Sequence, residues 1–255
     1  MYFPIKQKPA CQLKWTWSTI RLYEGSTSSC HRVDKEFITA DNFETFHNTP
    51  LKLQDRTKML AGEWPGRGCE HCKHIEDAGG TSDRMHHLTI PDLTPVELLT
   101  DPTAIEVTPQ IIEIYFDNVC NLSCLYCWDG FSSKIRSENT RYGRFEQDGV
   151  VIDNRAQLVD DLPELTEKFW NYMERNRSGI KRFHFLGGEP FYQKQFDYSL
   201  EWFKKYPCPN IEFNIVSNLN IEHEKFKQYI ASIKELVDNQ CLGRFDLTCS
   251  IDCLG

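Results

Sequence analysis

The stretch that decides the fold is Ile111–Trp128, which reads IIEIYFDNVCNLSCLYCW. A run of apolar and aromatic residues, interrupted only by Glu113, leads into a turn that carries Cys120, Cys124 and Cys127. Such residues favour a β-strand, so the pattern predicts that a strand delivers three thiols to its carboxyl end. Iron-sulfur cubanes normally take four cysteine ligands, so a set of three would leave one iron open to another ligand.

The Cys-x3-Cys-x2-Cys spacing, with Tyr126 before the last cysteine and Asn121 after the first, resembles the cluster loop of the radical SAM superfamily. The resemblance implies that the loop holds a 4Fe-4S cluster whose open iron binds S-adenosylmethionine (SAM), and that Tyr126 contacts the cofactor. It also implies that one electron cleaves SAM to methionine and a 5'-deoxyadenosyl radical, which abstracts hydrogen from a substrate. A zinc site or buried thiols are the alternative interpretation of the same cysteines.

A second motif follows the apolar run Phe183–Leu186. It consists of Gly187, Gly188, Glu189 and Pro190. In the radical SAM family such a segment ends a barrel strand and holds the amino group of SAM. Glycines let backbone carbonyls approach a cationic amine, and Glu189 adds negative charge. Without the cysteine loop, the same residues would be read as an ordinary turn.

From residue 105 onward, strand and helix patterns alternate. Apolar alternation predicts strands that end near residues 117, 186, 217 and 251, with a helix between each pair. This is the pattern of an α/β fold with a parallel sheet, whose ligands bind at the carboxyl ends of the strands. The resemblance implies a partial, TIM-like radical SAM barrel, with residues 105–255 as its first four strand-helix units. Because the family's barrel has six, we expect a chain truncated within the barrel.

Finer features of this second domain also follow from the pattern. Residues 128–154 are polar and predict a long connection, a lid or insertion over the site. A helix is predicted to begin near Pro163, and a later one to bury Phe226, Ile230, Ile233 and Val237. By resemblance, the strand-end residues Ser217, Asn218, Ser250 and Asp252 contact SAM or substrate. Each of the four could instead be a cap or turn residue.

Residues 1–104 are predicted to form a separate, Cys-rich module, in which Trp15–Ile20 resembles a strand. Its Cys-x13-Gly-x4-Cys spacing, from Cys11 to Cys30, resembles the opening of SPASM and Twitch modules, which carry auxiliary clusters in many radical SAM enzymes. Cys69 and Cys72 complete a set of four thiolates, enough to close a second 4Fe-4S cluster. The order is unusual, because such modules normally follow the barrel.

A four-cysteine zinc site is the alternative for this module, since Cys-x2-Cys pairs serve zinc equally well. His31, His71 and His74 are possible substitute ligands. Spacing does not separate iron-sulfur from zinc. Arg84 is expected to be a surface or interdomain charge.

The composition narrows the class of protein. The chain has 255 residues, a formal net charge of -8 and eleven cysteines. An odd number of cysteines, seven of them in metal-like groupings, argues against a secreted disulfide framework. The apolar runs are too short to span a membrane, and no signal peptide is evident, so a cytoplasmic protein is predicted. The acidic balance argues against nucleic acid as the main partner.

Together these features predict an oxygen-sensitive radical SAM enzyme that modifies a peptide or a small molecule. An external reductant such as flavodoxin or ferredoxin would supply the electron. The alternative from a different class is a non-catalytic zinc-binding or iron-sulfur electron-transfer protein.

Overall fold

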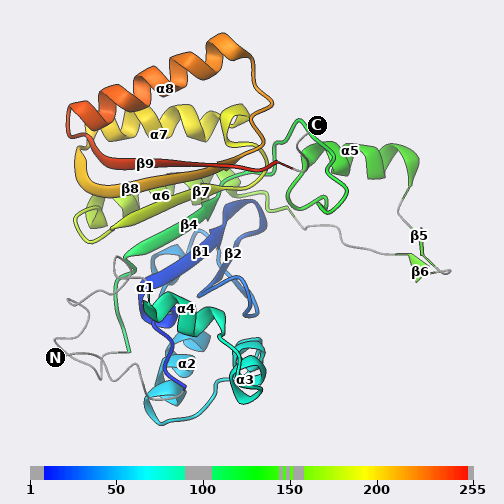
Figure 1. The fold of residues 1–255 in the computed structure, drawn as a ribbon, viewed down its shortest axis with the longest axis vertical. Helices are drawn as coiled ribbons and strands as arrows, with labels where there is room; N and C mark the ends of the chain where they lie inside the picture. Colours follow the sequence, from blue (N-terminus) through cyan, green and yellow to red (C-terminus); the bar gives the residue numbers. More distant parts are fainter. Residues whose placement is uncertain (1–8, 90–104, 144–145, 148–149, 152–157, 252–255) are drawn as a thin grey trace. The chain divides into compact units, whose positions relative to one another are not determined.

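The computed structural model describes residues 9–89, 105–143, 146–147, 150–151 and 158–251. The fold is α/β, as the sequence predicted, with a mostly parallel sheet of seven strands in the order β3-β2-β1-β4-β7-β8-β9 (Figure 1). The chain divides into two compact units, residues 1–20 with 26–112 and residues 21–25 with 113–255. The boundary predicted after residue 104 falls at the end of the undescribed stretch 90–104 and stays a prediction, as does the barrel.

The first unit holds short strands and four helices among its described residues. They are α1 (Leu13–Thr16), β1 (Trp17–Arg21), β2 (Ser26–Ser28), β3 (Glu36–Phe37), α2 (Pro50–Leu60), α3 (Cys69–Asp77) and α4 (Asp83–Thr89). The last residue of β1, Arg21, belongs to the second unit. The predicted strand Trp15–Ile20 is wrong at its start, because α1 takes Trp15 and Thr16. The Thr16 hydroxyl donates to the Gln12 carbonyl at 3.1 Å and so favours the helical turn.

Local capping fixes the ends of the helices in this unit. Thr49 caps α2, its hydroxyl accepting the Lys52 N–H, and Pro50 occupies the first turn, where its missing N–H costs nothing. Helix α3 ends at Asp77 and α4 begins at Asp83, with the two glycines Gly79 and Gly80 between them.

The second unit alternates strands with helices. It contains β4 (Ile111–Tyr115, with its first two residues counted in the first unit), α5 (Ser133–Tyr142), β5 (Glu146–Gln147), β6 (Val150–Val151), α6 (Leu162–Asn176), β7 (Arg182–Leu186), α7 (Lys194–Lys205), β8 (Cys208–Ser217), α8 (His223–Asp238) and β9 (Leu242–Cys249). Strands β7, β8 and β9 pair in parallel, and β5 pairs with β6 in a separate antiparallel ribbon. The predicted order of strand and helix is confirmed.

The sheet β7-β8-β9 has one aromatic face and one polar face. Phe183 and Phe213 are opposite each other in the register, fully buried, with ring centroids 5.3 Å apart. Phe169 of α6 and Phe203 of α7 pack on these rings, and α7 and α8 lie on one side of the strands in Figure 1. Burying a phenylalanine contributes about 1.5–3 kcal/mol, so this layer is a main source of stability and gives the strand ends a fixed platform.

Two finer predictions need correction. Helix α8 buries Ile233 as predicted, but its other buried residues are Tyr229 and Leu236, and Ile230 is 37% exposed. The predicted face with Ile230 and the observed face with Tyr229 both have helical spacing. The aromatic contact between Tyr229 and Phe196 buries the second. The predicted connection 128–154 contains helix α5, and its role as a lid or insertion over the site stays a prediction. Strand β9 ends at Cys249, two residues before the predicted end.

Candidate metal centres

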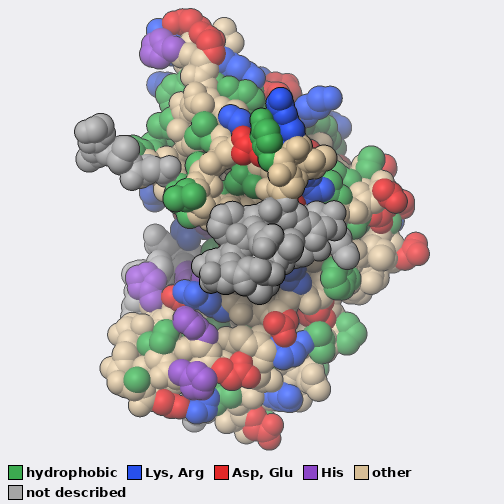
Figure 2. Space-filling model, turned by 90° about the vertical axis from the view of Figure 1, so that its right-hand side faces the viewer, with side chains coloured by type: hydrophobic (Ala, Val, Ile, Leu, Met, Phe, Trp, Pro, Cys, Tyr) green, Lys and Arg blue, Asp and Glu red, His purple; other side chains and the backbone are tan. Residues whose placement is uncertain are grey.

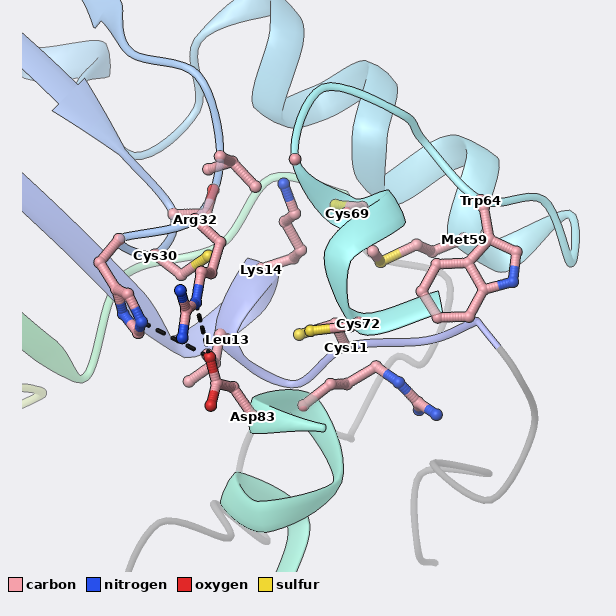
Figure 3. Close-up of a pocket in the computed structure, with 15 residues that line it drawn as sticks. Cys11, Leu13, Lys14, Cys30, Arg32, Met59, Trp64, Cys69, Cys72 and Asp83 are labelled. Atoms are coloured by element: carbon pink, nitrogen blue, oxygen red, sulfur yellow. Dashed lines mark hydrogen bonds and ion pairs between the residues drawn. The ribbon is translucent and has the colours of Figure 1, made fainter. Parts of the chain in front are cut away.

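In the first unit, the four predicted ligand cysteines line one cavity (Figure 3). Cys11 precedes α1, Cys30 follows β2, and Cys69 and Cys72 lie on the first turn and a half of α3. Residues three apart on a helix share a face, so the Cys-x2-Cys pair presents both thiols to the same side. The structure therefore brings together thiols that are up to 61 positions apart in the sequence (72 − 11 = 61).

Gly68 allows α3 to approach the segment after Cys30. It has a φ of +96°, and a Cβ at this position would lie 2.1 Å from the Arg32 carbonyl oxygen. Only glycine combines this backbone conformation with such close contact. The glycine before Cys69 thus places the two cysteine-bearing segments side by side.

The cavity is apolar, which raises the pKa of its thiols. Met59, Trp64 and Val33 pack with Cys11 and Cys69 in one hydrophobic cluster. Burial, followed by the neighbouring Cys30, raises the pKa of Cys11 to about 12, and burial raises that of Cys69 to about 11. Backbone N–H groups offset part of this effect, since Leu13 donates to the Cys11 sulfur and Arg32 and Val33 donate to Cys30. Thiols of this kind lose their protons when a cation replaces them.

Four thiols with backbone donors are a donor set for zinc or an iron-sulfur cluster. Among the described residues, no group of three or more His, Cys, Asp or Glu side chains is spaced to hold a metal ion. The cysteines therefore share a cavity without converging to coordination distance. Of the three histidines weighed as substitute ligands, His31 lines the cavity; its ring lies 3.5 Å from Asp83, and burial lowers its pKa.

In the second unit, the predicted cysteine loop follows β4 and is closed by side chains that bind backbone. The Asn118 amide donates to the Asp129 carbonyl at 2.8 Å, and the Ser132 hydroxyl donates to the Leu122 carbonyl at 2.7 Å. Ser132 is also the cap of α5, so the helix anchors the far end of the loop. The sequence placed the loop correctly at a strand end, but the helix that secures it was not foreseen.

The three loop thiols are half-buried. Cys127 donates its N–H to the Cys124 carbonyl at 3.0 Å, which forms a tight turn. Burial raises the pKa of Cys127, and the neighbouring Cys120 and Cys124 raise it further. Tyr126, the predicted cofactor contact in this loop, is 71% exposed. The loop thus carries three thiols at a surface that an external ligand can reach, and these thiols, like those of the cavity, are not spaced to hold a metal ion within the described ranges.

The glycine motif packs directly on the cysteine loop. Gly187 and Gly188 have positive φ angles of +89° and +53°. A Cβ on Gly188 would lie 2.0 Å from the Val119 carbonyl oxygen, and the Glu189 N–H donates to that same oxygen at 2.7 Å. The glycines are therefore required by a close backbone approach to the residue just before Cys120.

Glu189 connects the ends of two parallel strands. Its side chain is buried, and one carboxylate oxygen accepts from the Ser217 hydroxyl while the other accepts the Asn218 N–H, both at 2.8 Å. Burial raises the pKa of Glu189 despite these bonds. Pro190 is buried and begins a 3-10 turn (Pro190–Tyr192). The predicted contact between Glu189 and an amino group of a cofactor stays a prediction.

The segment after β8 also reaches the cysteine loop. The Asn218 amide donates to Asn121 at 3.1 Å and lies 4.0 Å from the Cys120 sulfur. Ser250 is exposed at its side chain, and its N–H donates to the Ser217 carbonyl. Asp252 lies outside the described residues. Three predicted site segments therefore meet at the carboxyl ends of β4, β7 and β8.

Sequence reasoning missed a row of polar side chains on the face of the sheet opposite the aromatic layer. Arg182 of β7 donates to Glu212 of β8 at 2.8 Å, and the Asn214 amide bonds both Glu212 and Asp246 of β9. Burial, together with Arg182, lowers the pKa of the neighbouring His184 to about 4. The signal was present as polar residues at alternate positions of each strand, between the apolar ones.

Two further charged residues were also missed. Lys14 lies in the cysteine cavity with its side chain 3% exposed, bonded to Asp55 at 2.6 Å. Arg84, expected at the surface, is 5% exposed and pairs with Glu76 at 2.5 Å. The apolar residues Leu13 and Trp15 on either side of Lys14 were the feature of the sequence that indicated its burial.

Comparisons with protein-family models, with curated protein sequences and with solved structures found no match to this chain. No helix within the described ranges is long and apolar enough to cross a membrane. Figure 2 shows basic and acidic side chains interspersed over the visible face of the described residues.

Proposed function

We propose that this chain is a radical SAM enzyme that acts on a peptide or small molecule, with a SAM-binding 4Fe-4S cluster on Cys120, Cys124 and Cys127. When bound, the cluster and SAM supply a one-electron cleavage that yields methionine and a 5'-deoxyadenosyl radical. The chain's own residues bind, orient and shield these groups. The proposal includes a cytoplasmic location and an external reductant such as flavodoxin or ferredoxin.

The observation that carries the proposal is the backbone junction between the cysteine loop and the glycine motif. Residues 69 positions apart (188 − 119 = 69) meet where Gly188 lies against the Val119 carbonyl and the Glu189 N–H donates to the same oxygen. A ligand held by the loop cysteines would therefore lie beside the backbone of Gly187 and Gly188. An ordinary turn would need the positive φ angles but not the contact with a thiol-bearing loop.

Each part of this junction has a role in the proposal. The loop thiols supply three ligands and leave one position for SAM. The carboxylate of Glu189 fixes the β8 end through Ser217 and Asn218 and adds negative charge near a cationic amine. The half-buried loop lets SAM and a reductant reach the cluster.

The polar face of β7, β8 and β9 is the proposed substrate side. Arg182, Glu212, Arg244 and Asp246 sum to zero formal charge, which suits a neutral polar or zwitterionic group. Buried Arg182 Nε and Asn214 Oδ1 have no hydrogen-bond partner within the described part of the chain. Buried polar atoms normally have a partner, so a water or a substrate group is expected to complete this row.

The four-thiol cavity is proposed to hold a second 4Fe-4S cluster, with zinc as the alternative. The apolar lining of the cavity favours either zinc or an iron-sulfur cluster that is shielded from solvent. This feature also favours the second candidate function, a zinc-binding or electron-transfer protein that cleaves nothing.

The test is anaerobic reconstitution with iron and sulfide, followed by reduction with dithionite in the presence of SAM. We expect 5'-deoxyadenosine and methionine in equal amounts by mass spectrometry, and loss of both products in Cys124→Ser. A cluster-loaded protein that forms neither product would contradict the proposed function.

A further inference from the structure

We infer that Lys14 is the charge-compensating residue of the four-cysteine site and sets how tightly that site holds its metal. The inference rests on the proposed metal binding by Cys11, Cys30, Cys69 and Cys72. It holds for zinc and for a 4Fe-4S cluster alike, because both leave four thiolates with a net charge of about -2.

Lys14 is buried in the wall of the cavity. Its side chain is 3% exposed and lines the same cavity as all four cysteines, and Figure 3 shows it between Cys30 and Cys69. Lys14 is close enough to Cys69 to lower the pKa of its thiol, against the larger effect of burial. A buried lysine is costly unless something compensates its charge, so its position in a thiol-lined cavity calls for negative charge there.

The carboxylate partner of Lys14 is shared with a second cation. Asp55 accepts from Lys14 through one oxygen at 2.6 Å and from Arg67 through the other at 2.8 Å. Arg67 is also close to the acidic residues Glu36 and Asp34. Of the two cations on Asp55, Lys14 is the one that lines the cavity.

The other charged groups that line the cavity are balanced. Arg32 pairs with Asp83 at 2.9 Å, with His31 also facing Asp83. Arg84 of the cavity wall pairs with Glu76 at 2.5 Å. Lys14 is therefore the cation of the cavity wall that is placed to offset part of the negative charge of bound thiolates.

The test measures metal affinity at the four-cysteine site alone. The full chain, with Cys120, Cys124 and Cys127 changed to Ser, is reduced and titrated with Co²⁺, whose thiolate charge-transfer absorption reports binding. Changing a group that supports metal ligands typically costs 10–100-fold in affinity, so Lys14→Met is expected to weaken Co²⁺ binding by about that factor. Lys14→Arg, which keeps the charge, should recover most of the loss.

Lys52 is the matched control for a general loss of stability. It is also buried in the first unit, but it donates to Ser18, Thr27 and Phe46 and does not line the cavity. Lys52→Met should leave Co²⁺ affinity within about threefold, while circular dichroism checks the folding of every variant. If Lys52→Met weakens binding as much as Lys14→Met does, the role of Lys14 is structural and the inference is wrong.

Asp55→Asn keeps the inference testable if Lys14→Met does not fold. This change removes the shared carboxylate and leaves both cations, so affinity should stay equal or rise even as thermal stability falls. Weaker binding in Asp55→Asn, or unchanged binding in a folded Lys14→Met, would overturn the inference. A parent protein that binds no Co²⁺ would overturn the four-cysteine site itself and the inference with it, whereas radical SAM activity would be tested separately at the loop cysteines.

Discussion

In the first unit, four cysteines line an apolar cavity, and Cys69 is 8% exposed; in the second, three half-buried cysteines share a loop with Leu125, which is fully exposed. The first set is gathered from three segments and is surrounded by core residues. The second comes from one segment and is fixed by backbone contacts to the glycine motif. A closed set of four suits a metal that stays in place, and an open set of three suits one that must accept a further ligand.

The largest expected difference between the two sites is in stability. Cys69→Ala removes a ligand from a core cavity and should lower Tm by about 10 °C or more, since metal binding at a structural site contributes to folding. Cys124→Ala on the exposed side should change Tm by about 2 °C or less. Calorimetry of both metal-loaded variants makes the comparison, and equal shifts would show that the sites do not differ in this way.

The next effect tests the contact between the glycine motif and the loop. Gly188→Ala adds a Cβ that would lie 2.0 Å from the Val119 carbonyl oxygen, on a backbone with φ of +53°. Strain and overpacking together should cost about 2–4 kcal/mol in urea unfolding and should reduce iron bound by the loop.

Gly143 is the matched control, because it also has a positive φ but nothing lies within 4 Å of its added Cβ. Gly143 has φ of +86° and ψ of 178°, a conformation that essentially only glycine adopts, so Gly143→Ala should cost about 1–3 kcal/mol from backbone strain alone and leave iron binding unchanged. Equal costs in both variants would mean that the contact with Val119 contributes little.

A smaller effect is expected at the carboxylate that joins β7 to β8. Each carboxylate oxygen of Glu189 accepts a backbone N–H, one from Asn218 and the other from Phe191, so Glu189→Gln turns its NH2 group toward one of them in either orientation. The change should cost about 1–3 kcal/mol, as expected for a buried donor left without its acceptor. Exposed Glu201→Gln, which loses a surface pair with Lys204, should change stability by about 0.5 kcal/mol or less. Urea unfolding that gives equal values for the two variants would contradict the role assigned to Glu189.

The smallest expected effect is a pH dependence on the polar face of the sheet. Burial raises the pKa of Glu212, but bonds from Arg182 and Asn214 outweigh it and lower the pKa from 4.5 to about 2. A depressed carboxyl pKa stabilises the folded state above pH 4.5, and this contribution is lost as pH falls towards about 2. Glu212→Gln should therefore lose less of its free energy of unfolding than the parent protein between these pH values, as measured by urea unfolding at several pH values. The same decrease in both proteins would show that Glu212 does not contribute.

The features that could be predicted from the sequence are those that depend on the pattern of neighbouring residues. The strand before Cys120, the turn at Gly187 and Gly188, and the order of helices all follow from periodicity and turn residues within about twenty positions. The shared cavity of the four N-terminal cysteines was expected from a resemblance, and the structure places these thiols together.

What the sequence did not predict depends on contacts between distant segments. The partners of Glu189 lie on the next strand, and the burial of Lys14 depends on Asp55, 41 positions later. The buried face of α8 was misassigned because two faces had the same spacing, and only packing of Tyr229 on Phe196 separates them. Which of these side chains are buried, and which partners they contact, depends on tertiary packing rather than on local propensity.

The most direct test of the central proposal is the iron and sulfide content of the anaerobically reconstituted protein, compared with the variant in which Cys120, Cys124 and Cys127 are all changed to Ala. We predict that the variant loses about four irons and about four sulfides per chain, the content of one cubane cluster. A variant that keeps all of its iron, or a parent that contains zinc without sulfide, would contradict a cluster on the central loop and with it the proposed radical SAM chemistry.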